Sequence, residues 1–280
     1  MRYLNYNNIK EFMMQTNITQ IITVLNDFTM ADELLAKTFD FAQKYHARVE
    51  ILYVHETPFF DVPDFFSTEV AGTLEKEKIK KEIEAKVATF KPSVTPAIFV
   101  KIDDTQDRVW ALARENKETL IITAYHEGIT EKLVSKVTQP VLVLKTATQS
   151  YKKIALVVDA GSDTPSCIKS VKQHFEESMV ELFYDYRYIV DPGMEADLQN
   201  VHIIEEAQRN AFEALKKEHG LDGKFFIDGD FLGTQMSEYL KNKNFDLLYT
   251  CSHGDDFFVS DNLAMSLLDT LHCDMLISSR

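Results

Sequence analysis

Two segments in the second half of the chain carry residues that could contact a ligand. The apolar run 154–158 ends in Asp159, and Gly161 and Ser162 follow it. Open α/β sheets bind ligands beyond the carboxyl ends of their strands, so this carboxylate, glycine and hydroxyl are candidate ligand contacts. The same residues also suit a turn in which Ser162 or Asp163 caps the next helix. Both interpretations stay open.

The first half repeats this pattern with different residues. Asp27 and Thr29 follow the run 21–25, and they too could contact a ligand or form a turn in which Thr29 caps a helix. The acidic segment 253–256, with Asp261 nearby, could bind a divalent cation or form a solvated surface loop. Its spacing matches no EF-hand or zinc pattern.

Sequence motifs for several common reactions are missing. The sequence has no Ser-His-Asp order, no G-x-S-x-G elbow, no Walker A run and no G-x-G-x-x-G. It therefore gives no basis for naming a reaction, and we expect a protein that is not an enzyme.

Alternating strand and helix patterns must position the candidate residues. In the first half we expect strands at 21–25, 48–55, 95–102, 119–124 and 141–144, and helices at 31–45, 69–90, 104–116 and 130–136. In the second half we expect strands at 154–158, 179–186, 224–227, 246–251 and 275–278, and helices at 164–175, 194–219, 234–242 and 262–271. Two such cycles predict the α/β class, with two tandem doubly wound domains that each hold a five-stranded parallel sheet flanked by helices.

The repeat also sets the expected domain boundaries. We expect an N-terminal arm at 1–18, whose segment 8–14 forms a short helix or packs on the body as an arm, a first domain at 19–146 and a second domain at 152–280. The polar stretch TATQSY is then the linker between the two domains.

The strand ends and the order of elements resemble the universal stress protein family. An Asp at the end of the first strand of the domain, a small turn, a long second helix and the closing strand PVLVLK at 140–145 carry the resemblance, which covers the chain from about residue 20. It implies an adenine nucleotide alpha hydrolase-like fold. Nucleotide-binding members have the run G-x2-G-x9-G-[ST] after the fourth strand, where glycines let backbone N–H groups approach phosphate.

Both halves depart from that run. The first half has only Gly128, with glutamates on both sides. In the second half Gly254 can stand for the second glycine, and Asp261-Asn262 align with the final Gly-[ST]. A carboxylate at ~4 Å from a phosphate charge costs about 4 kcal/mol at an effective dielectric of 20.

The resemblance therefore implies weak or no ATP binding and no required cofactor. The alternative is that ATP or AMP binds in the second domain only. The residues that would then contact the nucleotide are Asp159, Gly161, Ser162, Gly254 and Asn262.

Composition limits the partners and the compartment. The net charge of -14 and the pI of about 5.0 disfavour nucleic acid and anionic membranes as partners. No apolar run is long enough for a membrane span, and the first 20 residues do not form a secretory signal. We expect the three cysteines, Cys167, Cys251 and Cys273, to be reduced and buried in a cytoplasmic protein.

Two kinds of contact are expected between protein surfaces. Universal stress proteins dimerise around their last strand, and a tandem chain could make this contact internally by bringing 141–145 close to 274–278. A further homodimer is compatible with this arrangement. The phenylalanine-rich loop 57–66 could bind a protein partner or pack over the sheet.

We therefore expect a cytoplasmic tandem universal stress protein that serves as a non-catalytic binding or regulatory module. The alternatives are a nucleotide-binding member that uses its second domain only, and a small-molecule nucleotide hydrolase.

Overall fold

The structure, a computed structural model, describes residues 18–56, 69–158, 164–187, 198–228, 234–252 and 257–279. Strands and helices alternate through both halves. The first half contains β1 (Gln20–Leu25), α1 (Ala31–Tyr45), β2 (Arg48–His55), α2 (Glu69–Phe90), β3 (Ala97–Ile102), α3 (Thr105–Ala113), β4 (Thr119–Ala124), α4 (Thr130–Lys136) and β5 (Val141–Leu144). The second half contains β6 (Lys153–Val158), α5 (Thr164–His174), β7 (Met179–Arg187), α6 (Leu198–His219), β8 (Asp222–Asp228), α7 (Thr234–Lys241), β9 (Leu247–Ser252), α8 (Phe257–Thr270) and β10 (Asp274–Ser279).

The ten strands form one continuous sheet in the order β3-β2-β1-β4-β5-β10-β9-β6-β7-β8. Neighbouring strands within each half run parallel. At the centre β5 and β10 are antiparallel, with Leu142 opposite Leu276. The strand order on one side of this junction mirrors the order on the other. The predicted α/β class with five-stranded parallel sheets is confirmed, and the structure adds that the two sheets are continuous.

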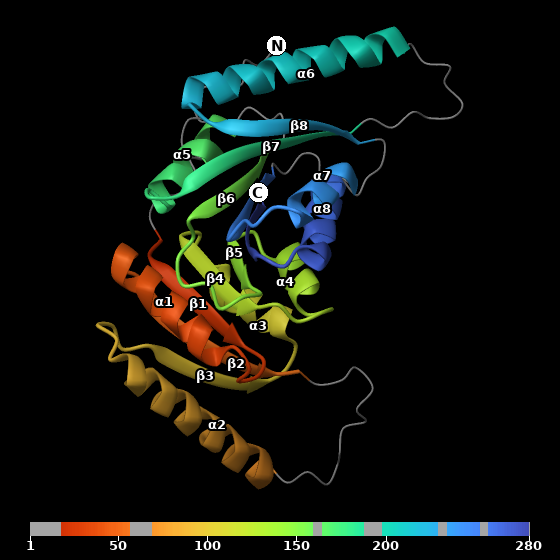
Figure 1. The fold of residues 1–280 in the computed structure, drawn as a ribbon. Helices are drawn as coiled ribbons and strands as arrows, with labels where there is room; N and C mark the ends of the chain where they lie inside the picture. The colour runs from red at the N-terminus through yellow and green to blue at the C-terminus, as the bar shows by residue number, and fades with distance from the viewer. Residues whose placement is uncertain are drawn as a thin grey trace, which may run out of the picture.

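Helices cover both faces of the sheet (Figure 1). One face packs against α1, α2, α5 and α6, and the other packs against α3, α4, α7 and α8. Each helical layer thus spans both halves and has its own apolar core. Every residue of β1 and β4 is buried, as expected for strands that have a neighbour on each side and helices on each face. None of the helices in the described ranges combines the length and apolar content that a membrane crossing needs.

The fully buried carboxylate of Asp274 joins the two halves at the start of β10. Its Oδ1 accepts from the backbone N–H groups of Lys145 and Thr146 at 2.8 and 3.0 Å, and from the Thr146 hydroxyl at 3.0 Å. Its Oδ2 accepts from the Tyr151 hydroxyl at 2.8 Å. Both ends of the linker are therefore bound to the last strand of the chain.

The middle of the linker is bound to α1. Lys37 Nζ donates to the carbonyl oxygens of Thr148 and Gln149 at 2.9 and 2.8 Å, and lies 4.1 Å from the centroid of the Tyr151 ring. Burial lowers the pKa of Lys37, while Asp274 and Asp40 act in the opposite direction. The polar segment between β5 and β6 is thus a packed part of the junction.

The helices α1 and α5 also meet across the junction. Tyr45 Oη and His174 Nδ1 share a hydrogen bond of 2.5 Å, and Lys44 Nζ donates to the His174 carbonyl oxygen. The Phe175 ring packs edge-on against Phe41. Burial, and secondarily the charge of Lys44, lowers the pKa of His174 to about 4. The imidazole is therefore neutral near pH 7.

Two sequence predictions need correction. Helix α8 begins at Phe257, five residues before the expected start, because no Pro or Gly interrupts residues 257–262. Met30, rather than Thr29, is the N-cap of α1, and it makes no side-chain capping bond. The expected arm, with its segment 8–14, lies outside the described residues, although Ile18 beside it is buried.

Candidate functional site

Asn26 links the carboxyl ends of the first-half strands. It follows β1, and its Nδ2 donates to the carbonyl oxygen of Val54 in β2 at 3.2 Å and to Oγ1 of Thr105 at 2.8 Å. Thr105 is the first residue of α3, so one side chain connects two strands to a helix. This is the edge at which open α/β sheets bind ligands.

Carboxylates occupy the N-terminus of α3. Glu56 Oε1 accepts from the backbone N–H of Thr105 at 2.8 Å, and Asp104 caps the helix by accepting from the N–H of Asp107 at 3.0 Å. Asp103 pairs with Arg108. A backbone hydrogen bond from Asp104, followed by the bond from Arg108, lowers the pKa of Asp103. The positive end of this helix is thus stabilised by carboxylates of the chain itself.

Three amide groups in the loop after β4 and at the start of α4 are bonded locally. The N–H of His126 donates to Thr130 Oγ1 at 2.8 Å, and those of Ile129 and Thr130 donate to the His126 carbonyl oxygen at 3.1 and 2.9 Å. Gly128 has φ of 76°, the left-handed conformation that glycine adopts without strain. A phosphate-binding loop needs amide groups that point outward, and three of the amides in this loop are already bonded.

Asp27 forms a turn at the same edge. Its Oδ1 accepts from the Thr29 N–H at 2.7 Å, and its Oδ2 lies 3.9 Å from His126 Nε2. The carboxylate therefore lies between the ends of β1 and β4. Asp27 thus forms the predicted turn, since a short Asp side chain readily bonds the backbone two residues further on, but Thr29 does not cap the helix.

The predicted nucleotide contacts of the second half remain predictions. Asp159, Gly161, Ser162 and Gly254 lie outside the described residues. Asn262 lies in the second turn of α8, although we expected it at the start of the helix, and its side chain is not described. The acidic segment 253–256 and the phenylalanine-rich loop 57–66 are likewise outside the described residues. Among those that are described, no group of three or more His, Cys, Asp or Glu side chains is placed to hold a metal ion.

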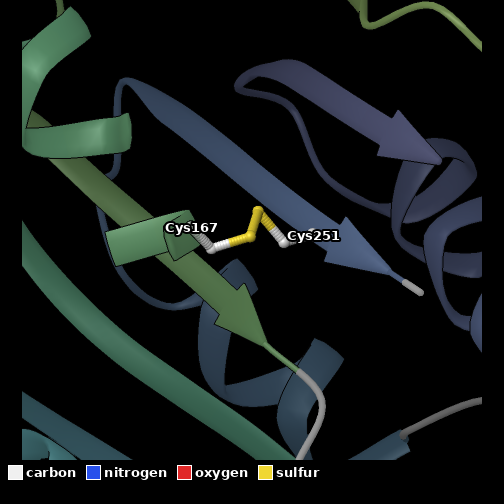
Figure 2. Close-up of a disulfide and its surroundings, with 2 residues drawn as sticks. All are labelled: Cys167 and Cys251. Atoms are coloured by element: carbon white, nitrogen blue, oxygen red, sulfur yellow. A yellow bond between two sulfur atoms is a disulfide. The ribbon is translucent and has the colours of Figure 1, made fainter. Parts of the chain in front are cut away.

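A disulfide joins Cys167 to Cys251 beside the second-half strand ends (Figure 2). The expectation of three reduced thiols is therefore wrong. Cys167 lies on α5 and Cys251 on β9, their Cα atoms are 6.4 Å apart, and 84 positions separate them in the sequence. The odd number of cysteines and their spacing concealed a pair that only the tertiary fold brings together. Cys273 is the remaining thiol, and burial raises its pKa to about 11.

Comparisons with known proteins give a structural relationship only. No protein-family model and no curated protein matches the sequence. A putative universal stress protein from Pseudomonas aeruginosa UCBPP-PA14 is 15% identical with a TM-score of 0.61, and the match covers 94% of both chains. A universal stress protein from Archaeoglobus fulgidus DSM 4304 is 10% identical with a TM-score of 0.64, and the match covers 95% of this chain and 97% of that one.

The chain has the universal stress protein fold. A functionally unknown protein from Pseudomonas aeruginosa PAO1 is also similar, with 15% identity, a TM-score of 0.62 and coverage of 94% of this chain and 93% of that chain. The matches extend over both halves, so the resemblance inferred from the sequence is confirmed at the level of the fold. At these identities they carry no information on ligands.

Proposed function

We propose that this protein is a tandem universal stress protein that acts in the cytoplasm as a non-catalytic regulatory module, with a first half that does not bind nucleotide. The single observation that supports the proposal best is the internal bonding of the loop after β4. There the amides of His126, Ile129 and Thr130 bond to atoms of the same loop.

The charges around this loop support the same conclusion. Asp27, Glu56 and Asp104 lie at the carboxyl ends of β1 and β2 and at the start of α3. Two cations beside α3 are already paired, Arg108 with Asp103 and Lys136 with Asp107. A bound triphosphate would meet carboxylates there, and at ~4 Å each such pair costs about 4 kcal/mol at an effective dielectric of 20.

The pairing of β5 with β10 supports the tandem part of the proposal. It joins the segments 141–144 and 274–279 in one sheet, and these are the segments that we expected to meet. We propose that this internal contact takes the place of the dimer contact between separate universal stress proteins. A homodimer, and a protein partner for the loop 57–66, are compatible additions. The net charge of -14 argues against nucleic acid and membrane partners.

Thermal unfolding with and without ATP–Mg²⁺ tests the proposal. A ligand present at about 100 times its Kd stabilises the folded state by about 2.7 kcal/mol. We expect no change in melting temperature at millimolar ATP or AMP, and no release of phosphate from ATP. A shift that Asp159→Ala abolishes and Asp27→Ala preserves would instead assign nucleotide binding to the second half. Phosphate release above that of a heat-denatured control would contradict the non-catalytic assignment.

A further inference from the structure

The disulfide lies where the two candidate segments of the second half begin. Cys251 is one residue from the end of β9, which precedes the segment with Gly254. Cys167 is in the first turn of α5, which follows the segment with Asp159 and Gly161. The S–S bond therefore fixes the distance between the two elements that carry these segments (Figure 2).

The first half has no crosslink at the corresponding place. Cys167 and Leu34 are each the fourth residue of their helix. Thr250 in β9 and Thr123 in β4 each pair with the second-to-last residue of the first strand of their half. Cys251 and Ala124 directly follow these residues, so they occupy equivalent positions in the two halves. Leu34 and Ala124 are both buried in the same apolar core as the cysteines. The fold thus needs only ordinary apolar packing at this position.

We propose that Cys167 and Cys251 form a reversible thiol–disulfide site through which the redox state of the surroundings controls how firmly the start of α5 is held against the end of β9. Disulfides in cytoplasmic proteins are usually transient and redox-sensing. If this protein acts in the cytoplasm, as we propose, its disulfide belongs to that class. The inference rests on the proposed function only for its cytoplasmic compartment, and it goes beyond that function because the thiol chemistry requires no ligand.

The oxidant class is a low-molecular-weight disulfide, such as oxidised glutathione. One cysteine thiolate attacks its S–S bond and releases one molecule of reduced glutathione. The second cysteine thiolate then displaces the other glutathione from the mixed disulfide, so that two thiols and one oxidised glutathione give one protein disulfide and two reduced glutathiones. Cys167 and Cys251 are only 2% and 6% exposed, so exchange requires local opening around the start of α5 and the end of β9.

Thiol counting on the full-length native protein tests the chemistry. The protein is equilibrated in glutathione buffers from fully reduced to fully oxidised, quenched with acid, denatured and alkylated, and its intact mass is measured. We expect three alkylated thiols at the reduced limit and one at the oxidised limit, with the change reversible in both directions. The Cys273→Ser variant should give two and none. Three thiols in every buffer, or one thiol in every buffer, would overturn the proposal.

Hydrogen exchange tests the coupling between α5 and β9. Amides in 164–170 and 247–252 should exchange at least several-fold faster after reduction, while those in 31–37 and 119–124 of the first half should not change. The matched control is Cys167→Leu with Cys251→Ala, which places the first-half residues at these positions and should exchange equally in both buffers. Equal exchange in oxidised and reduced wild type would refute the control of the contact between α5 and β9. Neither readout involves nucleotide, so a failure here is distinct from a failure of the proposed function.

Discussion

At the scale of single residues, Asp274 has the strongest consequence for stability. Its carboxylate accepts four hydrogen bonds from Lys145, Thr146 and Tyr151 and is fully buried. Asp274→Ala should lower the free energy of unfolding by about 3 kcal/mol or more, because buried donors that lose their acceptor retain the full cost of desolvation. Urea unfolding at pH 7 measures the change.

A second carboxylate provides the control for this prediction. Asp269 is exposed and accepts one bond, at 3.0 Å, from the hydroxyl of Tyr125. Asp269→Ala should cost less than about 1 kcal/mol, since exposed polar contacts contribute little. Equal losses in the two variants would mean that Asp274 does not hold the junction together.

His174 predicts a specific dependence of stability on pH. Burial lowers its pKa from 6.5 to about 4, so as the pH falls the unfolded chain binds a proton before the folded protein does. The stability linked to His174 is thus present above pH 6.5 and is lost as the pH falls towards 4. Between pH 7 and pH 5 the loss should be about 2 kcal/mol.

Urea unfolding at the two pH values tests the contribution of His174. The His174→Gln variant should show a smaller loss than wild type over this interval. His202, whose side chain is 78% exposed, supplies the control, and His202→Gln should retain the full loss. The assignment fails if wild type and His174→Gln lose the same amount.

At the scale of elements, the disulfide should contribute strongly to the stability of the second half. It closes a loop of 84 positions between α5 and β9, and the chain-entropy model gives about 4.5 kcal/mol for a loop of this length. Reduction should lower the free energy of unfolding by roughly this amount. Urea unfolding with and without reductant measures it, and the Cys167→Ser, Cys251→Ser double variant should be insensitive to reductant. A wild type equally insensitive to reductant would contradict the prediction.

The periodic patterns of the sequence predicted most elements to within a few residues. Strand β4 and helices α1, α2 and α4 begin and end where we expected, because burial on one or both faces imposes the pattern directly. The start of α8 was predicted wrongly because we placed it from the imperfect alignment of Asp261-Asn262 with the end of the glycine motif. Its first turn contains no glycine, and the helix simply extends to Phe257.

Long-range contacts explain why the candidate site was only partly predictable. The position of Asp27 at a strand end could be read from the sequence, because an apolar run stops there. The partners of Asn26, in contrast, are 28 and 79 positions away, and no local pattern encodes such contacts. The pairing of Cys167 with Cys251 depends in the same way on how α5 lies over β9.

At the scale of the whole molecule, the continuous sheet predicts cooperative unfolding of both halves. The junction combines β5–β10 pairing, the linker bonds to Asp274 and the contact between α1 and α5. Fluorescence of Trp110, the only tryptophan, reports on the first half, and far-ultraviolet circular dichroism reports on both. We expect coincident transitions in urea.

A charge at the junction supplies the matching test of cooperativity. Leu142 is fully buried opposite Leu276, so Leu142→Asp places an unpaired charge between the halves. This variant should separate the unfolding transitions of the two halves or lower the urea midpoints of both. Separate midpoints in the wild type would mean that the two halves of the sheet unfold independently.

The antiparallel junction of β5 and β10 also has a consequence for what each half can become. Two identical chains paired in this way would carry every feature twice, and their pairing would weaken on dilution. In one chain the partner is tethered at a fixed, high effective concentration, so the pairing persists at any dilution. Each half is then free to diverge, and here one half has Leu34 and Ala124 where the other has a disulfide. Because both halves belong to one chain, they can take on different roles, which two identical chains in a symmetric dimer cannot.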